Sequence, residues 1–536
     1  MQIPFVGGAY LGRSTAIDTS RSINFFVELS SDQAAKTPAA LVGTCGVSLW
    51  KRFGTSPIRG IYRFGAYLFV VCGTELYRVD ASGNVSTVGS LSTNEGPVYF
   101  TDNGIAAQGV GGNQMLILDY TYSYVYDLLD NTIQIHPSAN FPTAAIAAAY
   151  MDGYVIAAKD SMGITVSELY DLSTYNGLAI AAAIATPDNI KSIVNLHQQL
   201  FIIKEFATEV WYNTGTATQD GCPFARVSGA VIDYGTAAPL STARGDNSLF
   251  FLANQRVGDG TGSFIGVVQL QGYSPTIVSP PSIVYRMAQM TDLSSAQAFC
   301  YVFAGHLFYQ VTFPNDNATF VYDASTKLWH ERSTYTDSTE VEFDEDGYPS
   351  PKTLLPNKTN RHLASCYVFY NGTHLVGDYR TGNVYTMSSE AYDDNSEPII
   401  STRISPLLTD KTNTDPIFIS RLTIDMESGA GTGGTYLNPY GIGYLADGSI
   451  FADGLHFAGS TIELTTGGNP SAFLSWSDDS GKTWSGEYEA AIGKQGEYLT
   501  RLIWRRLGSA RNRAYKLRIS SPIKKIVTLA SVEASI

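Results

Sequence analysis

Along most of this chain, short hydrophobic runs of strand length are separated by tight turns. From Pro57 onward a unit recurs, made of a hydrophobic strand, a turn, and a second strand rich in Leu, Phe, Tyr and Val. The turns fall near Gly65, Asn103, Asp152, Gln198, Asp246, Gly305 and Asn371. The first four spacings, 38 to 49 residues, match a four-stranded propeller blade, whereas the last two, 59 and 66 residues, imply insertions. The pattern therefore predicts an all-β chain with a six- or seven-bladed β-propeller.

Strands that carry aromatic residues and finish on an acid are expected to end the repeats. The segments concerned are LYRVD at 76–80, MLILDY at 115–120 and FVYDASTKLW at 320–329. In the last of them, Asp323 and Lys327 flank a turn through which a third blade strand returns. A strand from the N-terminal 50 residues is expected to pair with the last blade, so that the ring has no exposed edge. The alternative is a pair of β-sandwiches, which would lack a fixed period.

Changes in composition along the chain suggest three regions. We expect an N-terminal extended segment at 1–50, the β-propeller at 51–400, and a C-terminal β-rich domain or completing strands at 401–536. The propeller is interrupted at 333–360 by a polar, acidic, Pro-containing surface loop, and the C-terminal region at 428–470 by a Gly-rich insertion. Because both insertions break a regular strand pattern, we expect one of them to form a gate or a partner contact.

Composition agrees with a turn-rich β protein. The 536 residues include 50 Gly and 33 Tyr, with 44% hydrophobic and 16% charged residues. The formal net charge of -14 disfavours a general nucleic-acid binder; it suits a conduit along which DNA slides, or it serves only solubility. Five scattered cysteines without a C-x-x-C motif predict reduced thiols. No run approaches the roughly 18 apolar residues of a spanning helix, so we expect a protein that is soluble until it assembles.

The C-terminal stretch is locally basic, unlike the chain as a whole. Its cationic residues are Arg501, Arg505, Arg506, Arg511, Arg513, Lys516, Arg518, Lys524 and Lys525. This stretch faces an acidic partner or a neighbouring subunit, contacts DNA, or is paired within the molecule, and the sequence does not choose among these.

One local motif has a known mechanism. Ser477, Asp479, Gly481, Thr483 and Trp484 match the S-x-D-x-G-x-T-W pattern of the Asp-box found in sialidase propellers. In this hairpin turn the Asp accepts backbone N–H bonds, the Gly takes a positive φ, and the Trp packs beneath the turn. Its role is structural. The chain has no metal-ligand spacing, phosphate loop or nucleophile triad that can be singled out, and we predict no catalytic, cofactor or metal site.

The stretch from Ile202 to Ser241 reads as two strands joined by a turn, with the patterns TEVWYNTG and PFARVSGAVIDYGTAAPLS. Its defining residues are Glu209, Trp211, Tyr212, Thr214, Gly215, Pro223, Phe224, Gly229 and Gly235. This stretch resembles the packaged-DNA stabilisation or tail nozzle (tail hub) proteins of short-tailed bacteriophages. The likeness continues in YDLSTYN with TPDNIKSIV (170–194), VGDYRTGNVY (376–385), and LSWSDDSGKTW with WRRLGSARNRAYKLRISSP (474–522).

The resemblance implies a structural virion protein rather than an enzyme. It implies a homohexameric tail ring, assembled in the host cytoplasm, below the portal and its adaptor. Tailspikes or tail fibres and a needle or plug would be its partners, and viral DNA would pass through the lumen without sequence-specific binding. The alternative is a carbohydrate-binding or glycan-cleaving β-propeller, because two carboxylates in spatial proximity are not visible in a sequence. A third possibility is a monomeric propeller scaffold with peptide partners.

Overall fold

The computed structural model describes residues 2–10, 12–30, 32, 35, 37–109, 111–257, 262–335, 360–409, 416–429, 470–494 and 496–535. The chain forms two compact units. One contains 9–14 and 45–397, and the other contains 1–8, 15–44 and 398–536. The acidic insertion predicted at 333–360 and the Gly-rich insertion predicted at 428–470 lie almost entirely outside the described residues.

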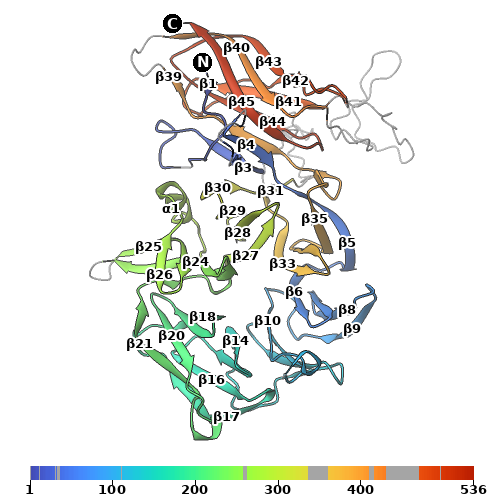
Figure 1. The fold of residues 1–536 in the computed structure, drawn as a ribbon, viewed down its shortest axis with the longest axis vertical. Helices are drawn as coiled ribbons and strands as arrows, with labels where there is room; N and C mark the ends of the chain where they lie inside the picture. The colour runs from blue at the N-terminus through green and yellow to red at the C-terminus, as the bar shows by residue number, and fades with distance from the viewer. Residues whose placement is uncertain are drawn as a thin grey trace, which may run out of the picture. The chain divides into compact units, whose positions relative to one another are not determined.

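The larger unit is a propeller of seven antiparallel blades around a central axis (Figure 1). Blades 1 to 3 comprise β6 (Ile58–Phe64), β7 (Tyr67–Cys72), β8 (Glu75–Val79) and β9 (Val85–Ser90); β10 (Tyr99–Asp102), β11 (Gln114–Leu118), β12 (Ser123–Asp127) and β13 (Thr132–Ile135); and β14 (Ala147–Met151), β15 (Tyr154–Ala158), β16 (Gly163–Glu168) and β17 (Asp171–Ala182).

Blades 4 and 5 comprise β18 (Ile190–Leu196), β19 (Gln199–Lys204), β20 (Thr208–Asn213) and β21 (Phe224–Ile232); and β22 (Gly235–Thr236), β23 (Ala243–Gly245), β24 (Ser248–Val257), β25 (Gly262–Gln271) and β26 (Ser274–Ile277). Blade 6 comprises β27 (Gln297–Phe303), β28 (His306–Phe313), β29 (Ala318–Asp323) and β30 (Leu328–Glu331). A short helix, α1 (Pro281–Met287), precedes blade 6, and the β31 (Ser333–Thr334) and β32 (Asn360–Arg361) pair follows it.

The ring closes through the N-terminal part of the chain, as expected. Blade 7 contains β33 (Ala364–Tyr370), β34 (Thr373–Asp378) and β35 (Gly382–Ser388), and its fourth strand is β5 (Gly46–Gly54). Antiparallel pairing of β35 with β5 runs from Ser388 opposite Gly46 to Gly382 opposite Gly54. Because this strand comes from the other end of the propeller sequence, opening the ring requires breaking a sheet.

Each of the seven turns predicted from the sequence lies in the connection between the first two consecutive strands of one blade or, in blade 5, between β23 and β24. Several of them have consecutive residues with positive φ, for example Asp152 and Gly153 at 51° and 88°, and Asn371 and Gly372 at 47° and 75°. Positive φ at both central residues gives the turn a twist that matches the twist of the paired strands. The two long spacings are explained by the segment containing α1 and by the segment between blades 6 and 7.

One expectation about blade ends is wrong. Of the three segments expected to end repeats, only FVYDASTKLW reaches a last strand, because it contains β29 and the start of β30. LYRVD forms the third strand of blade 1, β8, which is followed by β9, and MLILDY forms the second strand of blade 2, β11. The third strand there is SYVYD, which is β12. The error in blade 2 arises because Asp119 and Tyr120 directly follow β11, whereas Asp127 ends β12, so that an aromatic residue and an acid occur near the end of both strands.

The hydrophobic core is distributed between blades. One cluster joins Val155 and Ala157 of blade 3 to Leu116 and Leu118 of blade 2, and another joins Phe201 of blade 4 to blade 5. Because the strands are covered on both faces, they read as nearly continuous apolar runs, such as LFII in β19. The blades therefore support one another around the ring as a rigid wall.

The smaller unit consists of two antiparallel sheets. The first has the order β3 (Phe25–Leu29), β4 (Ala39–Gly43), β45 (Ile526–Ser535), β40 (Ile417–Met426) and β43 (Leu502–Ala510), with β1 (Gln2–Ile3) paired to β45. The second has the order β2 (Arg21–Ile23), β38 (Ser401–Ile404), β44 (Asn512–Ile519), β41 (Ser471–Ser477) and β42 (Tyr488–Ala491), with β39 (Leu408–Thr409) on β44. The N-terminal 50 residues thus contribute β1 to β4 to this unit and β5 to the propeller.

Candidate functional site

The motif of Ile202 to Ser241 forms a hairpin of blade 4, which is built from β20 and β21. Trp211 is buried and lies opposite Arg226, whereas Tyr212 is 45% exposed, because neighbouring strand residues point to opposite faces. Phe224 begins β21 and packs in the same hydrophobic cluster as Trp211. The strands therefore carry Trp211 and Phe224 into the core of the blade and leave Tyr212 on the surface.

The turn residues of this hairpin hold its backbone. The Gly215 N–H donates to Asn213 Oδ1 at 2.9 Å, and Thr214 Oγ1 donates to the Pro223 carbonyl at 2.9 Å. Gly215 and Gly229 both have φ of 77°, which suits glycine. Gly235 serves packing instead, because a Cβ there would lie 2.4 Å from the Lys204 carbonyl oxygen.

Glu209 belongs to a buried ionic cluster that the sequence did not reveal. Lys204 Nζ lies 3.4 Å from Glu209 Oε1 and 3.3 Å from Asp188 Oδ1, and the Lys204 and Glu209 side chains are fully buried. Glu209 also accepts from Trp211 Nε1 at 3.1 Å and from the Ala185 N–H at 2.9 Å. Two segments used for the resemblance, TPDNIKSIV with Asp188 and TEVWYNTG with Glu209, therefore converge on Lys204.

Other hydrogen-bonding atoms of this cluster also have partners. Lys204 Nζ donates to the Ala183 carbonyl at 2.7 Å, and Asp188 Oδ2 accepts from the Phe206 N–H at 2.8 Å. Burial raises the pKa of Asp188. Hydrogen bonds from Thr186 and Phe206, together with the charge of Lys204, lower this pKa by more than burial raises it, so it lies below the ordinary value. The cluster fixes the loops around β19 and β20. The sequence signal was the lysine at the end of the apolar run LFIIK.

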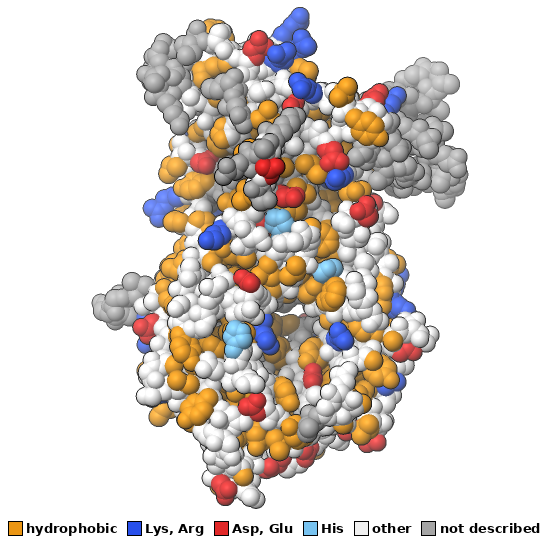
Figure 2. Space-filling view, in the orientation of Figure 1, with side chains coloured by type: hydrophobic (Ala, Val, Ile, Leu, Met, Phe, Trp, Pro, Cys, Tyr) orange, Lys and Arg blue, Asp and Glu red, His pale blue; other side chains and the backbone are white. Residues whose placement is uncertain are grey.

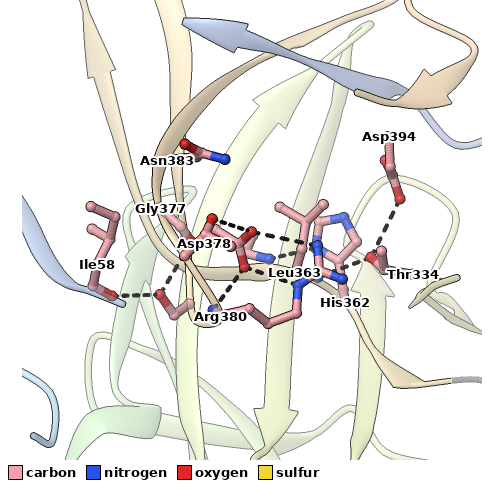
Figure 3. Close-up of polar contacts among 12 residues, drawn as sticks. Ile58, Thr334, His362, Leu363, Gly377, Asp378, Arg380, Asn383 and Asp394 are labelled. Carbon is pink, nitrogen blue, oxygen red and sulfur yellow. Dashed lines mark hydrogen bonds and ion pairs between the residues drawn. The ribbon is translucent and has the colours of Figure 1, made fainter. Parts of the chain in front are cut away.

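A second polar cluster forms where the segment VGDYRTGNVY turns between β34 and β35. The Asp378 carboxylate accepts from the Arg380 N–H at 2.8 Å, from Arg380 Nε at 3.2 Å and from Thr381 Oγ1 at 2.9 Å (Figure 3). Beside it, Ser365 Oγ lies 3.2 Å from the carbonyls of Ile58 and Gly377, and so links blade 7 to blade 1. These contacts stabilise the seam at which the ring closes.

A pocket of 480 Å³ opens at the same seam, between the first strands of blades 6, 7 and 1. Arg361, in its wall, stacks over Tyr379 with its guanidinium carbon 3.6 Å from the ring centroid. Arg59 also lines the pocket, but its guanidinium donates to the carbonyls of Gly73, Thr93, Glu95 and Gly96. The Arg59 side chain in the pocket wall therefore holds the connection between blades 1 and 2.

The predicted Asp-box adopts a tight turn between β41 and β42. Asp479 Oδ1 accepts from Ser477 Oγ at 2.6 Å and from the Lys482 and Thr483 N–H groups at 2.9 Å. Gly481 has φ of 86° and donates its N–H to Ser477 Oγ at 2.7 Å, while Trp484 is partly buried with Lys516 Nζ 4.6 Å from its ring centroid. The hydrogen bonds from Ser477 and Thr483 hold the pKa of Asp479 well below its usual value.

Most of the basic C-terminal stretch is paired within its own unit. Ion pairs join Arg501 to Asp425, Arg513 to Asp478, Arg518 to Glu487, and Lys524 to Glu427. Lys525 is buried and donates to the Ile399 carbonyl at 2.7 Å. Within the described part of the chain, Arg505, Arg506 and Arg511 are exposed and have no carboxylate at ion-pair distance.

The described residues contain no group of three or more His, Cys, Asp or Glu side chains that is arranged to hold a metal ion. Across the same residues, no helix is both long enough and apolar enough to span a membrane.

Comparison with protein families shows to which family the chain belongs. A family profile described as "Bacteriophage P22 Gp10, beta-propeller" matches residues 1–344, and one described as "Bacteriophage P22 Gp10, beta-sandwich" matches residues 449–535. This chain belongs to the bacteriophage P22 Gp10 family. Gp10-family membership identifies a structural phage tail protein and not an enzyme, which decides against the glycan-cleaving alternative. The Gp10 profiles also agree with the observed β-propeller and with the two C-terminal sheets as a β-sandwich.

No curated protein sequence matches this Gp10-family chain significantly. Among solved structures, the extracellular domain of the hybrid two-component system protein BT4673 from B. thetaiotaomicron aligns at 11% identity and a TM-score of 0.37, over 64% of this chain and 40% of that one. The Pan2 WD40 domain of Neurospora crassa aligns at 9% identity and a TM-score of 0.36, over 62% and 89% of the two chains. The designed protein Ika8 aligns at 11% identity and a TM-score of 0.35, over 64% and 99%. The assignment rests on the family profiles alone.

Proposed function

We propose that this protein is the tail nozzle, or tail hub, subunit of a short-tailed phage. Copies of it form a ring, a homohexamer, that closes the portal channel to retain packaged DNA and conducts the DNA during ejection. Its site of action is the virion tail, after assembly in the host bacterial cytoplasm. The observation that carries the proposal is family membership over both the propeller and the sandwich.

The proposed partners follow from the place of a nozzle in the tail. They are the portal adaptor or head–tail connector on one side, tailspikes or tail fibres around the ring, and a tail needle or plug at the distal end. The viral DNA passes through the lumen without sequence-specific binding. The Gly-rich and acidic insertions, which lie outside the described residues, are our proposed gate or partner contacts.

The fold supports a conduit that is formed between copies rather than within one propeller. The seam pocket has a volume of 480 Å³, which is the size of a small-molecule cavity and far too small for a DNA duplex. The strand-closed ring of blades resists opening, so each propeller acts as a rigid wall segment. The net charge of -14 limits adhesion of phosphates to that wall, so Asp and Glu are expected to face the lumen.

The mass of the purified protein tests this proposal, measured by light scattering and negative-stain imaging, alone and after mixing with phage portal–adaptor complexes. We expect a six-fold ring that docks at the adaptor. A monomer that ignores the adaptor and binds glycan would overturn the proposal and favour a carbohydrate-binding propeller. A docked ring whose lumen is lined by arginine would contradict the proposed mechanism of DNA passage.

A further inference from the structure

Three arginines lie on β40 and β43 in the first sheet of the sandwich, and a fourth, Arg511, directly follows β43. We name Arg421, Arg505, Arg506 and Arg511 the arginine patch. Arg505, Arg506 and Arg511 are exposed, and only Arg421 forms an ion pair with a described residue, at 3.3 Å from Glu533. Figure 2 shows Lys and Arg side chains gathered in the region of β40 and β43. In a chain of net charge -14, this is a local reversal of sign.

The patch is shaped by a β-bulge. Ile419 pairs with Gly508 and Arg421 pairs with Arg505, so Ser420 of β40 faces both Arg506 and Leu507 of β43. Arg506 has φ of 59°, a left-handed conformation that is uncommon for a residue with a side chain. Bulges of this kind turn a side chain away from the regular sheet face. Here the bulge presents a second arginine beside Arg505.

A buried arginine fixes the backbone of this bulge. Arg513 is 3% exposed and donates from Nε and Nη2 to the two carboxylate oxygens of Asp478, at 2.6 and 2.7 Å. Its Nη1 donates to the Leu507 carbonyl, inside the bulge. Bidentate pairing of this kind orients the guanidinium. The backbone of the bulge, which carries Arg505 and Arg506, is therefore held by contacts within the chain.

The patch carries a cost in the isolated chain, because Arg421 and Arg505 lie directly opposite each other and like charges in that position repel. The side chains around it show what kind of partner would offset that cost. Phe418 is 56% exposed on β40 and Ile503 is 38% exposed on β43. Arginine combined with exposed aromatic and aliphatic side chains is the composition of a protein interface, and this favours a protein partner over nucleic acid.

We propose that the arginine patch binds a carboxylate-bearing surface on a second copy of this chain. The excess of 49 acidic over 35 basic residues gives each copy the complementary charge. A patch of like charge cannot meet its own equivalent across a two-fold axis, so the contact joins two different surfaces. Contacts of this kind generate closed rings when the rotation closes. The inference rests on the proposed ring, for which it supplies one side of the contact between neighbouring copies.

The test compares the full-length protein with the double variant Arg505→Glu/Arg506→Glu. The control is Lys159→Glu/Lys482→Glu, which changes net charge equally at exposed positions outside the patch. Assembly is measured by sedimentation velocity across protein and salt concentrations, and duplex DNA binding by fluorescence anisotropy. We expect the patch variant to need about tenfold more protein for half-assembly, or more, and the control to assemble as the wild type does.

Each other outcome overturns the inference in a distinguishable way. If the wild type and the patch variant assemble equally, the patch is not the contact, although the proposed ring stands. If the wild type does not assemble alone or on the adaptor, the proposed function fails together with the inference. If assembly is unchanged but salt-sensitive DNA binding is lost in the patch variant, the partner is nucleic acid. Thermal unfolding of both variants checks that they are folded.

Discussion

Buried carboxylates in the propeller fasten the turns that follow their strands. Asp119 Oδ1 accepts from the Thr121 N–H at 3.0 Å, Asp323 Oδ1 from the Ser325 N–H at 2.9 Å, and Asp378 Oδ1 from the Arg380 N–H at 2.8 Å. Each carboxylate thereby satisfies a backbone donor that leaves the sheet. The same residue type ends strands in different blades, because each turn at the end of a strand has the same unsatisfied donors.

Replacing Glu209 by Ala is predicted to destabilise the protein by about 3 kcal/mol, because one partner of a buried charge is lost. Lys204 stays fully buried, with Asp188 as its remaining counter-charge. Urea unfolding measures the change in free energy. The matched control is Asp160→Ala, which breaks an exposed pair with Lys191 and is expected to cost less than about 1 kcal/mol. Equal losses in the two variants would contradict the assigned role of the cluster.

The pH dependence of stability is predicted to depend on Asp394. Burial raises the pKa of Asp394 from 3.8 to about 6, although Arg332 opposes this shift. Between those values the folded state binds more protons than the unfolded chain, so the contribution of Asp394 to stability falls as pH rises from about 4 to 6. Asp394→Asn should remove a fall of up to about 3 kcal/mol. Unfolding free energies from pH 4 to 7 test this.

The variant Asp130→Asn is the control, because Asp130 is exposed and is not among the charges that shift the pKa of Asp394. It should keep the wild-type slope between pH 4 and 7. A wild-type slope in Asp394→Asn as well would show that another group is responsible.

At the scale of the element, the closing strand β5 decides whether the propeller is a ring. Val47 is fully buried and pairs with Met387, whereas Leu49, in the same strand, is 49% exposed. Val47→Asp is predicted to lower stability by about 3 kcal/mol or more, because it buries a charge without a partner. Hydrogen exchange should show loss of protection in β5 and β35. Leu49→Asp is the control, and in this variant the amides of β5 and β35 are expected to stay protected from exchange. Loss of protection in both variants would contradict the role given to burial of Val47, because any change in β5 would then open the sheet.

Turn chemistry made the blades predictable, because a hairpin with positive φ needs particular residues at its centre. Asp152-Gly153 and Asn371-Gly372 are such pairs, and every predicted turn lies between two strands of a blade. The division of the N-terminal segment between propeller and sandwich was not predictable, since strand partners far apart in sequence leave no local signal. The Lys204 cluster was missed for the same reason. Asp188 lies in the connection between β17 and β18, and only the fold brings it to Lys204 at the end of β19.

At the scale of the whole molecule, the charge distribution separates a conduit from a DNA-binding protein. Affinity for duplex DNA grows with the number of phosphates that cations neutralise, and it falls steeply with salt. In the described part of the basic stretch, the ion pairs leave Arg505, Arg506 and Arg511 as exposed arginines without a carboxylate partner, in a chain of net charge -14. A few arginines amid that excess of carboxylates cannot hold a duplex in place at physiological salt.

The assembled protein is therefore predicted to show no measurable duplex binding at about 0.15 M salt, where charges are screened beyond about 8 Å. Fluorescence anisotropy of a labelled duplex, titrated with protein across salt concentrations, measures this, with Arg505→Glu/Arg506→Glu as the comparison. Any weak binding at low salt should disappear with a shallow salt slope, because few phosphates are contacted. Tight binding that survives physiological salt would mean that the wall grips DNA, and the acidic wall would then not be the surface along which the genome slides.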